Sequence, residues 1–321
     1  MRIELINPLT RSPITQVSGK LIDQDGVVFP FQNGAYRLVT NENYTTNFGF
    51  QWNKFAKTQI DRLQYGLNQS YERFFSVTNW DNEELNGKNI LEVGSGAGRF
   101  SQIVLQHTSA NLFSVDYSDA VEANFKNNGP NDRLTLFQAS IYSLPFKPSQ
   151  FDKVFCFGVL QHTPDFKQSV KALVEMVKPG GELIVDFYPI TGWHTKIHSK
   201  YLLRRFTKKM QPEKLLAIIE RNANWLITAY KFFDSMGIGK LINRFLPICD
   251  IKSTLPRGLS KETLREWVIL DTFDMFSPAF DKPQRAATVS RWFEEFGMRH
   301  IESTIIKYGD GNSVSVVKGI K

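Results

Sequence analysis

Short apolar runs alternate with stretches of helical period through the middle of the chain. Five such runs, at residues 89–93, 112–116, 134–138, 151–157 and 182–187, are separated by segments in which apolar positions recur every three or four residues. Strands buried on both faces read as continuous apolar runs, and helices usually connect parallel strands. The pattern therefore predicts an α/β fold with a mostly parallel sheet covered by helices on both faces.

The first 86 residues have a different pattern. Turn signals at Ser18-Gly19, Asp25-Gly26 and Asn33-Gly34 separate short apolar stretches, which indicates a small β module over residues 1–40. Residues 41–86 are rich in aromatic side chains and are predicted to form a helical N-terminal extension. The parallel sheet is expected to begin after them, in a core spanning residues 87–187.

The segment after the fifth run contains no strand pattern. Residues 188–260 are rich in helix formers and aromatic residues, with breaks at Gly237, Gly239, Pro247 and Pro256. We expect this segment to be an α-helical cap inserted into the α/β core. Residues 261–321, with a last helix at 286–296 and strands at 301–306 and 313–317, are expected to complete the sheet.

Composition indicates a globular protein without disulfide bonds or a membrane span. Of the 321 residues, 42% are hydrophobic, which is ample for a buried core, and two cysteines give no disulfide framework. The chain shows neither a signal-peptide pattern nor an apolar run long enough to span a membrane, so we expect a cytoplasmic protein.

The net charge of +7 is unevenly distributed. Six basic residues of the predicted cap lie close together in sequence: Lys196, Lys200, Arg204, Arg205, Lys208 and Lys209. They are interpreted either as a solvated helix face or as a surface for an anionic partner. An anionic substrate and peripheral contact with a membrane that carries a lipid-linked substrate both remain open.

The first apolar run of the core leads into three glycines at alternate positions. The sequence N-I-L-E-V-G-S-G-A-G-R-F covers residues 89–100 and includes Gly94, Gly96 and Gly98. Glycine tolerates positive φ and lets the backbone approach a nucleotide-like ligand closely. The dinucleotide fingerprint G-x-G-x-x-G needs its third glycine at position 99, where this chain has Arg99.

With Glu92 two positions before it, this motif resembles motif I of class I S-adenosyl-L-methionine (SAM) dependent methyltransferases. Four further segments, at residues 112–116, 134–146, 151–165 and 177–186, are similar to this family's motifs and follow in its order. The resemblance implies a Rossmann-like seven-stranded sheet with an antiparallel edge, the cofactor SAM and the product S-adenosyl-L-homocysteine. It assigns cofactor contacts to Glu92, Gly94, Ser95, Gly96, Gly98, Asp116, Tyr117, Ser140, Ile141, Phe157 and Gly158.

Two of these positions carry specific expectations. Asp116 ends the second strand about 20 residues past the glycines, where a carboxylate can accept both hydroxyls of an adenosine ribose. Ser140 stands where the family usually has an acidic residue beside the adenine.

The N-terminal module resembles the zinc-ribbon segment that accompanies many bacterial methyltransferases. The four ligand positions of that segment fall on Asn7, Thr10, Ile22 and Asp25, none of which is cysteine or histidine. A tetrahedral zinc site is therefore not expected, and no other metal site is predicted. We interpret residues 1–40 as a metal-free module that keeps the ribbon's shape.

Candidate catalytic residues flank the ends of the strands. His162 follows the fourth strand and is a candidate general base, although it could instead hold its loop by hydrogen bonding. Asp271 and Asp274 are candidates for the same role, with helix capping or charge pairing as the alternative. Trp52, Tyr188 and His194 are candidate substrate contacts, Trp52 also as part of a lid over the cofactor.

These features predict a transferase that methylates a small molecule, most simply at a hydroxyl oxygen of a sugar, secondary-metabolite or lipid-linked intermediate. An RNA methyltransferase is one alternative, but an amino-group nucleic-acid enzyme would carry [N/D]-P-P-[Y/F] where this chain reads Cys156-Phe-Gly-Val-Leu160. A non-catalytic SAM-binding or partner-docking protein is the other. The identity of the acceptor and the oligomeric state are left open.

Overall fold

The computed structural model describes residues 3–39, 44–64, 67–190, 192, 197–309 and 311–321. Within them, the main sheet has the strand order β12-β13-β11-β10-β7-β8-β9-β6-β5. Its central strands are β7 (Asn89–Val93), β8 (Asn111–Asp116), β9 (Leu134–Gln138), β10 (Phe151–Phe157) and β11 (Val177–Phe187). These five strands are parallel, which confirms the predicted α/β architecture.

Two strands complete the core sheet on one side. β13 (Asn312–Ile320) pairs antiparallel with β11, and β12 (Arg299–Tyr308) pairs antiparallel with β13. The predicted antiparallel edge is confirmed. On the other side, β6 (Ala35–Arg37) pairs parallel with β9, and β5 (Phe31–Gln32) pairs with β6. The sheet thus exceeds the predicted seven strands by two short ones, both from the N-terminal segment.

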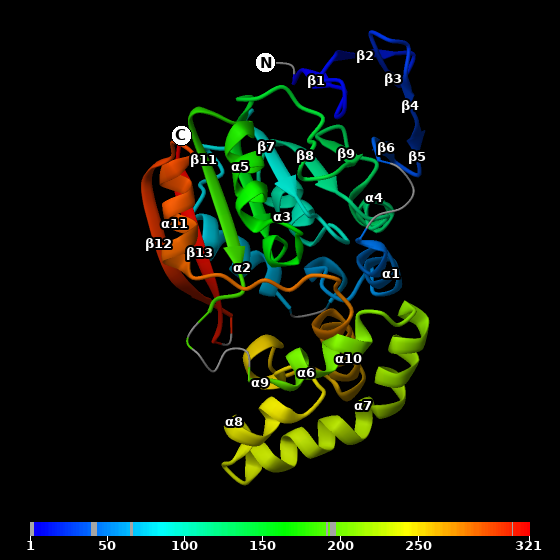
Figure 1. Ribbon diagram of the computed structural model, residues 1–321, viewed down its shortest axis with the longest axis vertical. Coiled ribbons are helices and arrows are strands. Elements are labelled where there is room, and N and C mark those ends of the chain that lie inside the picture. The colour runs from blue at the N-terminus through cyan, green and yellow to red at the C-terminus, as the bar shows by residue number, and fades with distance from the viewer. Residues whose placement is uncertain (1–2, 40–43, 65–66, 191, 193–196, 310) are drawn as a thin grey trace.

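Helices cover both faces of the sheet (Figure 1). On one face, α5 (Phe166–Met176) and α11 (Ala286–Glu295) bury Val170, Leu173 and Phe293 against the strands. On the other, α2 (Gln69–Thr78) and α3 (Arg99–His107) bury Phe74 and Ile103. α4 (Val121–Asn128) packs beside them and contacts β9 and β6.

The connectivity of the sheet locates a binding crevice. The chain runs from β7 through β8 to β9 on one side, then crosses to β10 and β11 on the other side of β7. Ligands of such sheets bind beyond the carboxyl ends of the strands at this reversal of strand order. The ends of β7 and β10 therefore mark the expected site.

The N-terminal segment forms a second, four-stranded sheet from β1 (Leu5–Ile6), β2 (Pro13–Val17), β3 (Lys20–Asp23) and β4 (Val28–Phe29). Two of its turns meet through side chains. Asn7 Nδ2 donates a 2.5 Å hydrogen bond to Asp23, while Asn7 accepts from the N–H of Leu9 and Asp23 accepts from the N–H of Val27. A buried polar pair thus joins two turns of the module, and it includes Asn7, one of the four positions compared with zinc ligands.

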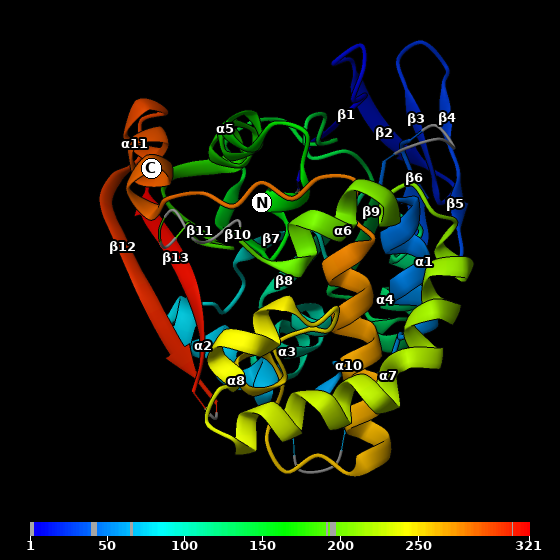
Figure 2. The same ribbon diagram turned by 60° about the horizontal axis from the view of Figure 1, so that its bottom comes forward.

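The helical cap lies beyond the carboxyl ends of the strands (Figures 1 and 2). It contains α6 (Ser199–Thr207), α7 (Pro212–Ser235), α8 (Gly239–Ile242), α9 (Ile251–Thr254) and α10 (Lys261–Phe276). α10 begins after residue 260, where we placed the end of the cap. It nevertheless packs Leu270 and Phe273 against Leu215 and Leu216 of α7, so it shares the hydrophobic core of the cap.

One helix of the N-terminal extension lies between the cap and the sheet. α1 (Thr46–Lys54) contributes Phe50 and Trp52 to the hydrophobic cluster of α7 and α10, and Phe55 follows it there. The described part of the extension also contains a short 3-10 turn, η1 (Asp61–Leu63), before α2. No helix in the described ranges is both long and apolar enough to cross a membrane.

Candidate active site

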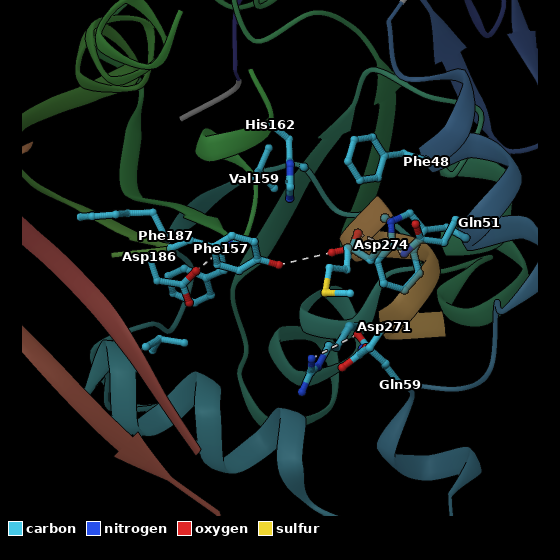
Figure 3. A pocket seen from close by; sticks show the side chains of 18 of the residues that line it. Phe48, Gln51, Gln59, Phe157, Val159, His162, Asp186, Phe187, Asp271 and Asp274 are labelled. Carbon is cyan, nitrogen blue, oxygen red and sulfur yellow. Dashed lines mark hydrogen bonds between the residues drawn. The ribbon is translucent and has the colours of Figure 1, made fainter. Parts of the chain in front are cut away.

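A cavity of about 560 Å³ lies between the carboxyl ends of the parallel strands, α1 and the cap. Its walls come from segments far apart in sequence, including the glycine loop, the turn after β10, the end of β11 and the inner face of α10. Figure 3 shows His162 and Phe48 at one end of the view and Asp271 with Gln59 at the other. The cavity therefore joins the predicted cofactor loop to the predicted substrate residues.

The glycine loop connects β7 to α3 with three residues in the left-handed region. The φ angles of Gly94, Gly96 and Gly98 are +85°, +52° and +83°. The N–H of Gly94 donates to the carbonyl of Val115 at 2.7 Å, and the N–H of Gly98 donates to the carbonyl of Ser95 at 2.9 Å. Such angles are unfavourable for residues that carry a Cβ, so the loop requires glycine at these positions.

Neighbouring side chains occupy the space that a Cβ would need. A Cβ on Gly94 would lie 2.2 Å from Val159 Cγ2, and one on Gly98 would lie 2.3 Å from Asn124 Oδ1. A Cβ on Gly96 would lie 3.1 Å from the Trp52 indole nitrogen. From the sequence, these glycines were predicted to let a ligand approach the backbone closely. The structure shows that they also admit three protein side chains.

Asp116 connects the end of β8 to the glycine loop. Its Oδ2 accepts a 2.8 Å hydrogen bond from the N–H of Gly96, and its Oδ1 accepts from both the N–H and the hydroxyl of Ser118. Burial raises the pKa of Asp116, while these hydrogen bonds oppose the shift. Asp116 also lines the cavity, where its carboxylate can accept a hydrogen bond from a ligand.

Glu92 lies beneath the loop and outside the cavity lining. Its carboxylate accepts hydrogen bonds from the hydroxyls of Ser101 and Ser114, the latter at 2.8 Å. Burial is the main cause of a rise in the pKa of Glu92 to about 7, although both hydroxyl contacts act against it. In this arrangement Glu92 ties β7 to α3 and β8, and so supports the loop from below.

The other predicted cofactor residues divide in the same way. Ser95, Tyr117, Ile141, Phe157 and Gly158 line the cavity, whereas Gly98 and Ser140 do not. Ser140 Oγ instead accepts a hydrogen bond from the N–H of Tyr142, within its own turn. The Ser95 hydroxyl is buried, lines the cavity and has no hydrogen-bond partner among the described residues. A ligand in the loop would supply that partner.

His162 is held with one ring nitrogen fixed and the other unpartnered. It lies in the 3-10 turn η2 (Leu160–His162), where Nδ1 is 3.0 Å from the carbonyl oxygen of Phe280. A carbonyl only accepts, so Nδ1 carries the proton and Nε2 is an acceptor. Nε2 is buried and has no partner among the described residues, and His162 lines the cavity. Burial lowers the pKa of this histidine, which favours the neutral form.

Asp274 links α10 to two other elements of the site. Its carboxylate accepts 3.3 Å hydrogen bonds from the Gln51 side-chain amide and from the Tyr188 hydroxyl. Asp271, one turn earlier on α10, also lines the cavity, and burial followed by the nearby Asp274 raises its pKa to about 7. The structure thus places both predicted carboxylates on the wall of the cavity that the cap forms.

The predicted substrate residues have different outcomes. Tyr188 and Trp52 line the cavity, whereas His194 lies outside the described residues. The edge of the Tyr188 ring packs against His162, with centroids 5.7 Å apart, and the Lys200 ammonium lies 4.9 Å from the centroid of the Tyr188 ring. Lys200 also pairs with the buried Asp281 at 2.8 Å. Tyr188 therefore connects the histidine to the first helix of the cap.

Two partly buried arginines were not predicted as site residues. Arg73 of α2 donates to Asp186 Oδ2 through Nε and Nη2, at 3.2 and 2.6 Å, while Asp186 Oδ1 accepts from the N–H of Gly158. Arg99 donates to the Ser70 hydroxyl and to Gln59. Both arginines line the cavity. Each arginine precedes a phenylalanine in its helix. An arginine on an otherwise apolar helix face was the only sequence signal that could have identified them as site residues.

This combination of features defines a class of protein. A parallel sheet that reverses its strand order at the site, a glycine loop after the first core strand and a carboxylate at the end of the second form the class I methyltransferase site. Residues 91–185 match the family model described as a methyltransferase domain. The chain therefore carries a class I SAM-dependent methyltransferase domain.

Named proteins similar to this chain include two kinds of methyltransferase. It is 33% identical over 101 residues to a ubiquinone biosynthesis O-methyltransferase of Coxiella burnetii, which covers 31% of this chain and 43% of that protein. It is 29% identical over 158 residues to a tRNA U34 carboxymethyltransferase of Nautilia profundicola, which covers 49% and 51%. The matched region thus spans only about half the length of each of these curated relatives.

Among solved structures, magnesium protoporphyrin IX methyltransferase of Synechocystis with bound SAH is similar at 14% identity, with a TM-score of 0.47, over 87% of this chain and 96% of that one.

SAM is the cofactor of this class of domain, and the geometry of the cavity fits it. The glycine loop presents backbone and the unpartnered hydroxyl of Ser95, and the Asp116 carboxylate lines the cavity, where it can accept a hydrogen bond from a ribose hydroxyl. Ile141 and Phe157 provide apolar surface near the loop for a planar base. These residues would hold the nucleoside part of the cofactor, on the sheet side of the cavity.

Proposed function

We propose that this protein is a SAM-dependent methyltransferase that acts on a hydroxyl oxygen of a small acceptor enclosed beneath the cap. The observation that carries the proposal is the His162 imidazole. Its Nδ1 is fixed on the carbonyl of Phe280, its Nε2 has no partner among the described residues, and the residue lines a cavity shared by the glycine loop and the cap. A neutral, buried imidazole in this position can take a proton from a hydroxyl group.

The reaction needs alignment more than activation. When bound, SAM would supply a methyl group activated by positive sulfur, and its transfer to the acceptor oxygen would leave S-adenosyl-L-homocysteine. The acceptor hydroxyl donates its hydrogen to His162 Nε2, so the proton passes to the imidazole as the new bond forms. Trp52, the cap and the aromatic rings around His162 exclude water and orient the acceptor.

The polar groups on the cap side support an acceptor that carries several hydroxyls. Asp271 and Asp274 can accept hydrogen bonds from hydroxyls, while the buried Trp267 indole N–H lacks a partner among the described residues and can donate one. Trp52 and Tyr188 add ring faces of the kind that pack on sugars or on aromatic metabolites. The acceptor class we propose is therefore a sugar, secondary-metabolite or lipid-linked intermediate.

Two measurements test this function. Isothermal titration with SAM should give binding well below 1 mM, and the absence of heat at about 1 mM would refute the cofactor assignment. Incubation of a small-molecule extract with methyl-labelled SAM, followed by mass spectrometry, should place the label on an oxygen of a low-mass compound. Labelling of RNA in a parallel incubation, with none in the extract, would contradict the small-molecule proposal in favour of the RNA alternative.

A further inference from the structure

The excess positive charge of the chain is concentrated in the cap. Residues 188–260 contain 13 lysines and arginines but four aspartates and glutamates, a net charge of +9, whereas the whole chain carries +7. The remaining residues together are therefore slightly negative. The cap presents a cationic surface on an otherwise nearly neutral protein, and such a surface attracts anionic partners.

The same segment exposes much apolar surface. Among the described residues, 11 of the 21 exposed large apolar side chains lie between residues 197 and 245. The most exposed are Phe206 (72%), Leu241 (67%), Leu202 (61%), Met236 (57%), Phe232 (56%) and Trp225 (54%). Single exposed apolar residues need no explanation, but a concentrated group rimmed by cationic residues indicates an interaction site.

These residues share one side of the cap. Ile218, Trp225 and Phe232 are spaced by seven residues, which places them on one stripe of α7, and Met236 follows at its C-terminal end. Lys214 and Arg221, four residues before and three residues after Ile218, lie on the same stripe. α8 follows α7 directly and adds Lys240 and Leu241. We call these side chains of α7 and α8 the outer cap face. In Figure 2, α7 and α8 lie along the side of the cap away from the sheet.

α6 begins near one end of this surface. Arg244, just after α8, donates a hydrogen bond to the carbonyl of Ile197, and the Ser199 hydroxyl donates to the carbonyl of Leu246, so α6 begins beside this end of the outer cap face. α6 exposes Leu202 and Phe206 and is followed by the exposed Lys208 and Lys209. All three helices thus expose both apolar and cationic side chains.

We propose that the outer cap face docks the protein onto an anionic lipid bilayer. Trp225, Phe232 and Met236 would enter the boundary between headgroups and acyl chains, while the neighbouring lysines and arginines contact lipid phosphates. A second copy of the chain fits less well, since two faces of the same positive sign would repel each other. Nucleic acid would match the charge but leave aliphatic side chains such as Ile218 and Leu241 in water. This inference rests on the cap surface alone and is independent of the proposed reaction.

Flotation with lipid vesicles tests the proposal on the full chain. Protein should float with vesicles of phosphatidylcholine containing 30% (about one lipid in three) phosphatidylglycerol, and binding to phosphatidylcholine alone should be at least about ten-fold weaker. Because each cation near the surface contributes about five-fold, the double variant Arg221→Glu/Lys240→Glu should weaken binding at least about ten-fold. Trp225→Ser/Phe232→Ser should do so about ten-fold as well, through loss of inserted apolar surface.

Matched controls keep the test sharp. Ile305→Ser removes an apolar side chain that is 63% exposed on β12, and Lys126→Glu reverses an exposed charge on α4. Both should bind vesicles like the wild type, and all variants should keep the wild-type melting temperature within a few degrees. No flotation with anionic vesicles would overturn the proposal, as would wild-type binding by the Trp225→Ser/Phe232→Ser variant. Binding of RNA or formation of a dimer, in the absence of vesicle binding, would assign the face to that partner instead.

Discussion

Gly94 and Val159 are packed so closely that a methyl group on the glycine would lie 2.2 Å from Val159 Cγ2. The first belongs to the glycine loop after β7 and the second to the turn after β10, so this contact joins the two strands that flank the site. We predict that Gly94→Ala destabilises the protein by roughly 2–4 kcal/mol, from backbone strain at φ +85° and from overpacking. Thermal unfolding would measure it.

Gly87→Ala provides the matched control for that clash. Gly87 also has a positive φ, +68°, but a Cβ there would meet no atom within 4 Å. It should therefore cost about 1–2 kcal/mol from backbone strain alone. In addition, Gly94→Ala/Val159→Ala should recover part of the loss. Equal destabilisation by Gly87→Ala and Gly94→Ala would show that Val159 does not restrict the loop.

His162→Asn is predicted to lower the rate of methyl transfer by about 100-fold or more, because the acceptor hydroxyl loses its proton acceptor. SAM affinity should change little, since the hydrogen bond that fixes His162 is made to the carbonyl of Phe280 and not to the glycine loop. Titration with SAM and single-turnover methyl transfer would separate the two effects. His107→Asn, at the end of α3 and outside the cavity lining, is the control. Full activity of His162→Asn would assign the histidine to loop support.

The activity should also resist mild acid. His162 must be neutral to accept a proton, and burial lowers its pKa below the ordinary value of 6.5. As pH falls, the rate should therefore hold through about 6.5 and decline only below it, if no other group limits the reaction. The pH profile of single-turnover rates would check this. A half-maximal rate clearly above pH 6.5 would contradict the assignment of His162 as the base.

Asp116→Ala is predicted to weaken SAM binding by about 1–3 kcal/mol, through loss of the hydrogen bonds to the ribose. The same change removes the contacts to Gly96 and Ser118, so stability should fall as well. Ser118→Ala separates these effects. It deletes one donor to Asp116 Oδ1 but lies outside the cavity lining, so it should affect melting more than SAM affinity. Unchanged affinity in Asp116→Ala would remove Asp116 from the cofactor site.

Asp271→Asn should stabilise the protein at high pH. Burial raises the pKa of Asp271 to about 7, so the folded state binds this proton more tightly than the unfolded state does. The stability contributed by the protonated form is complete below the ordinary pKa of about 4 and is lost as pH rises through 7. The variant should match the wild type only at about pH 4 or below, gain on it progressively as pH rises, and exceed it near pH 8 by on the order of 1–3 kcal/mol. Melting curves of both proteins across this pH range would measure the difference. A constant difference from pH 4 to pH 8 would contradict a raised pKa for Asp271.

The parallel core could be predicted from sequence because its signals are local. The apolar runs and the three alternate glycines at 94, 96 and 98 correspond to β7 through β11 and to the loop after β7. Asp116 and Gly94 are near in sequence to the turns that position them. For such residues, side-chain chemistry and strand order are enough to place them at one edge of the sheet.

The cap side of the site could not be predicted in the same way. Asp274 contacts Gln51, 223 residues earlier, and His162 is fixed by a carbonyl 118 residues later. These contacts depend on how α1 and α10 pack, which local pattern does not specify. Arg73 was missed for the same reason, because only the folded chain brings it to Asp186. The two strands added by the N-terminal segment are too short to leave a clear periodic signal.

Those two short strands also determine what the open edge of the sheet can do. Beyond β9, the sheet continues through the three residues of β6 and ends on the two residues of β5. A long, flat edge at β9 would offer unpaired backbone groups to a neighbouring chain, and so promote aggregation. A two-residue terminal strand offers almost no such template. The N-terminal segment therefore protects this edge of the sheet from pairing with another chain.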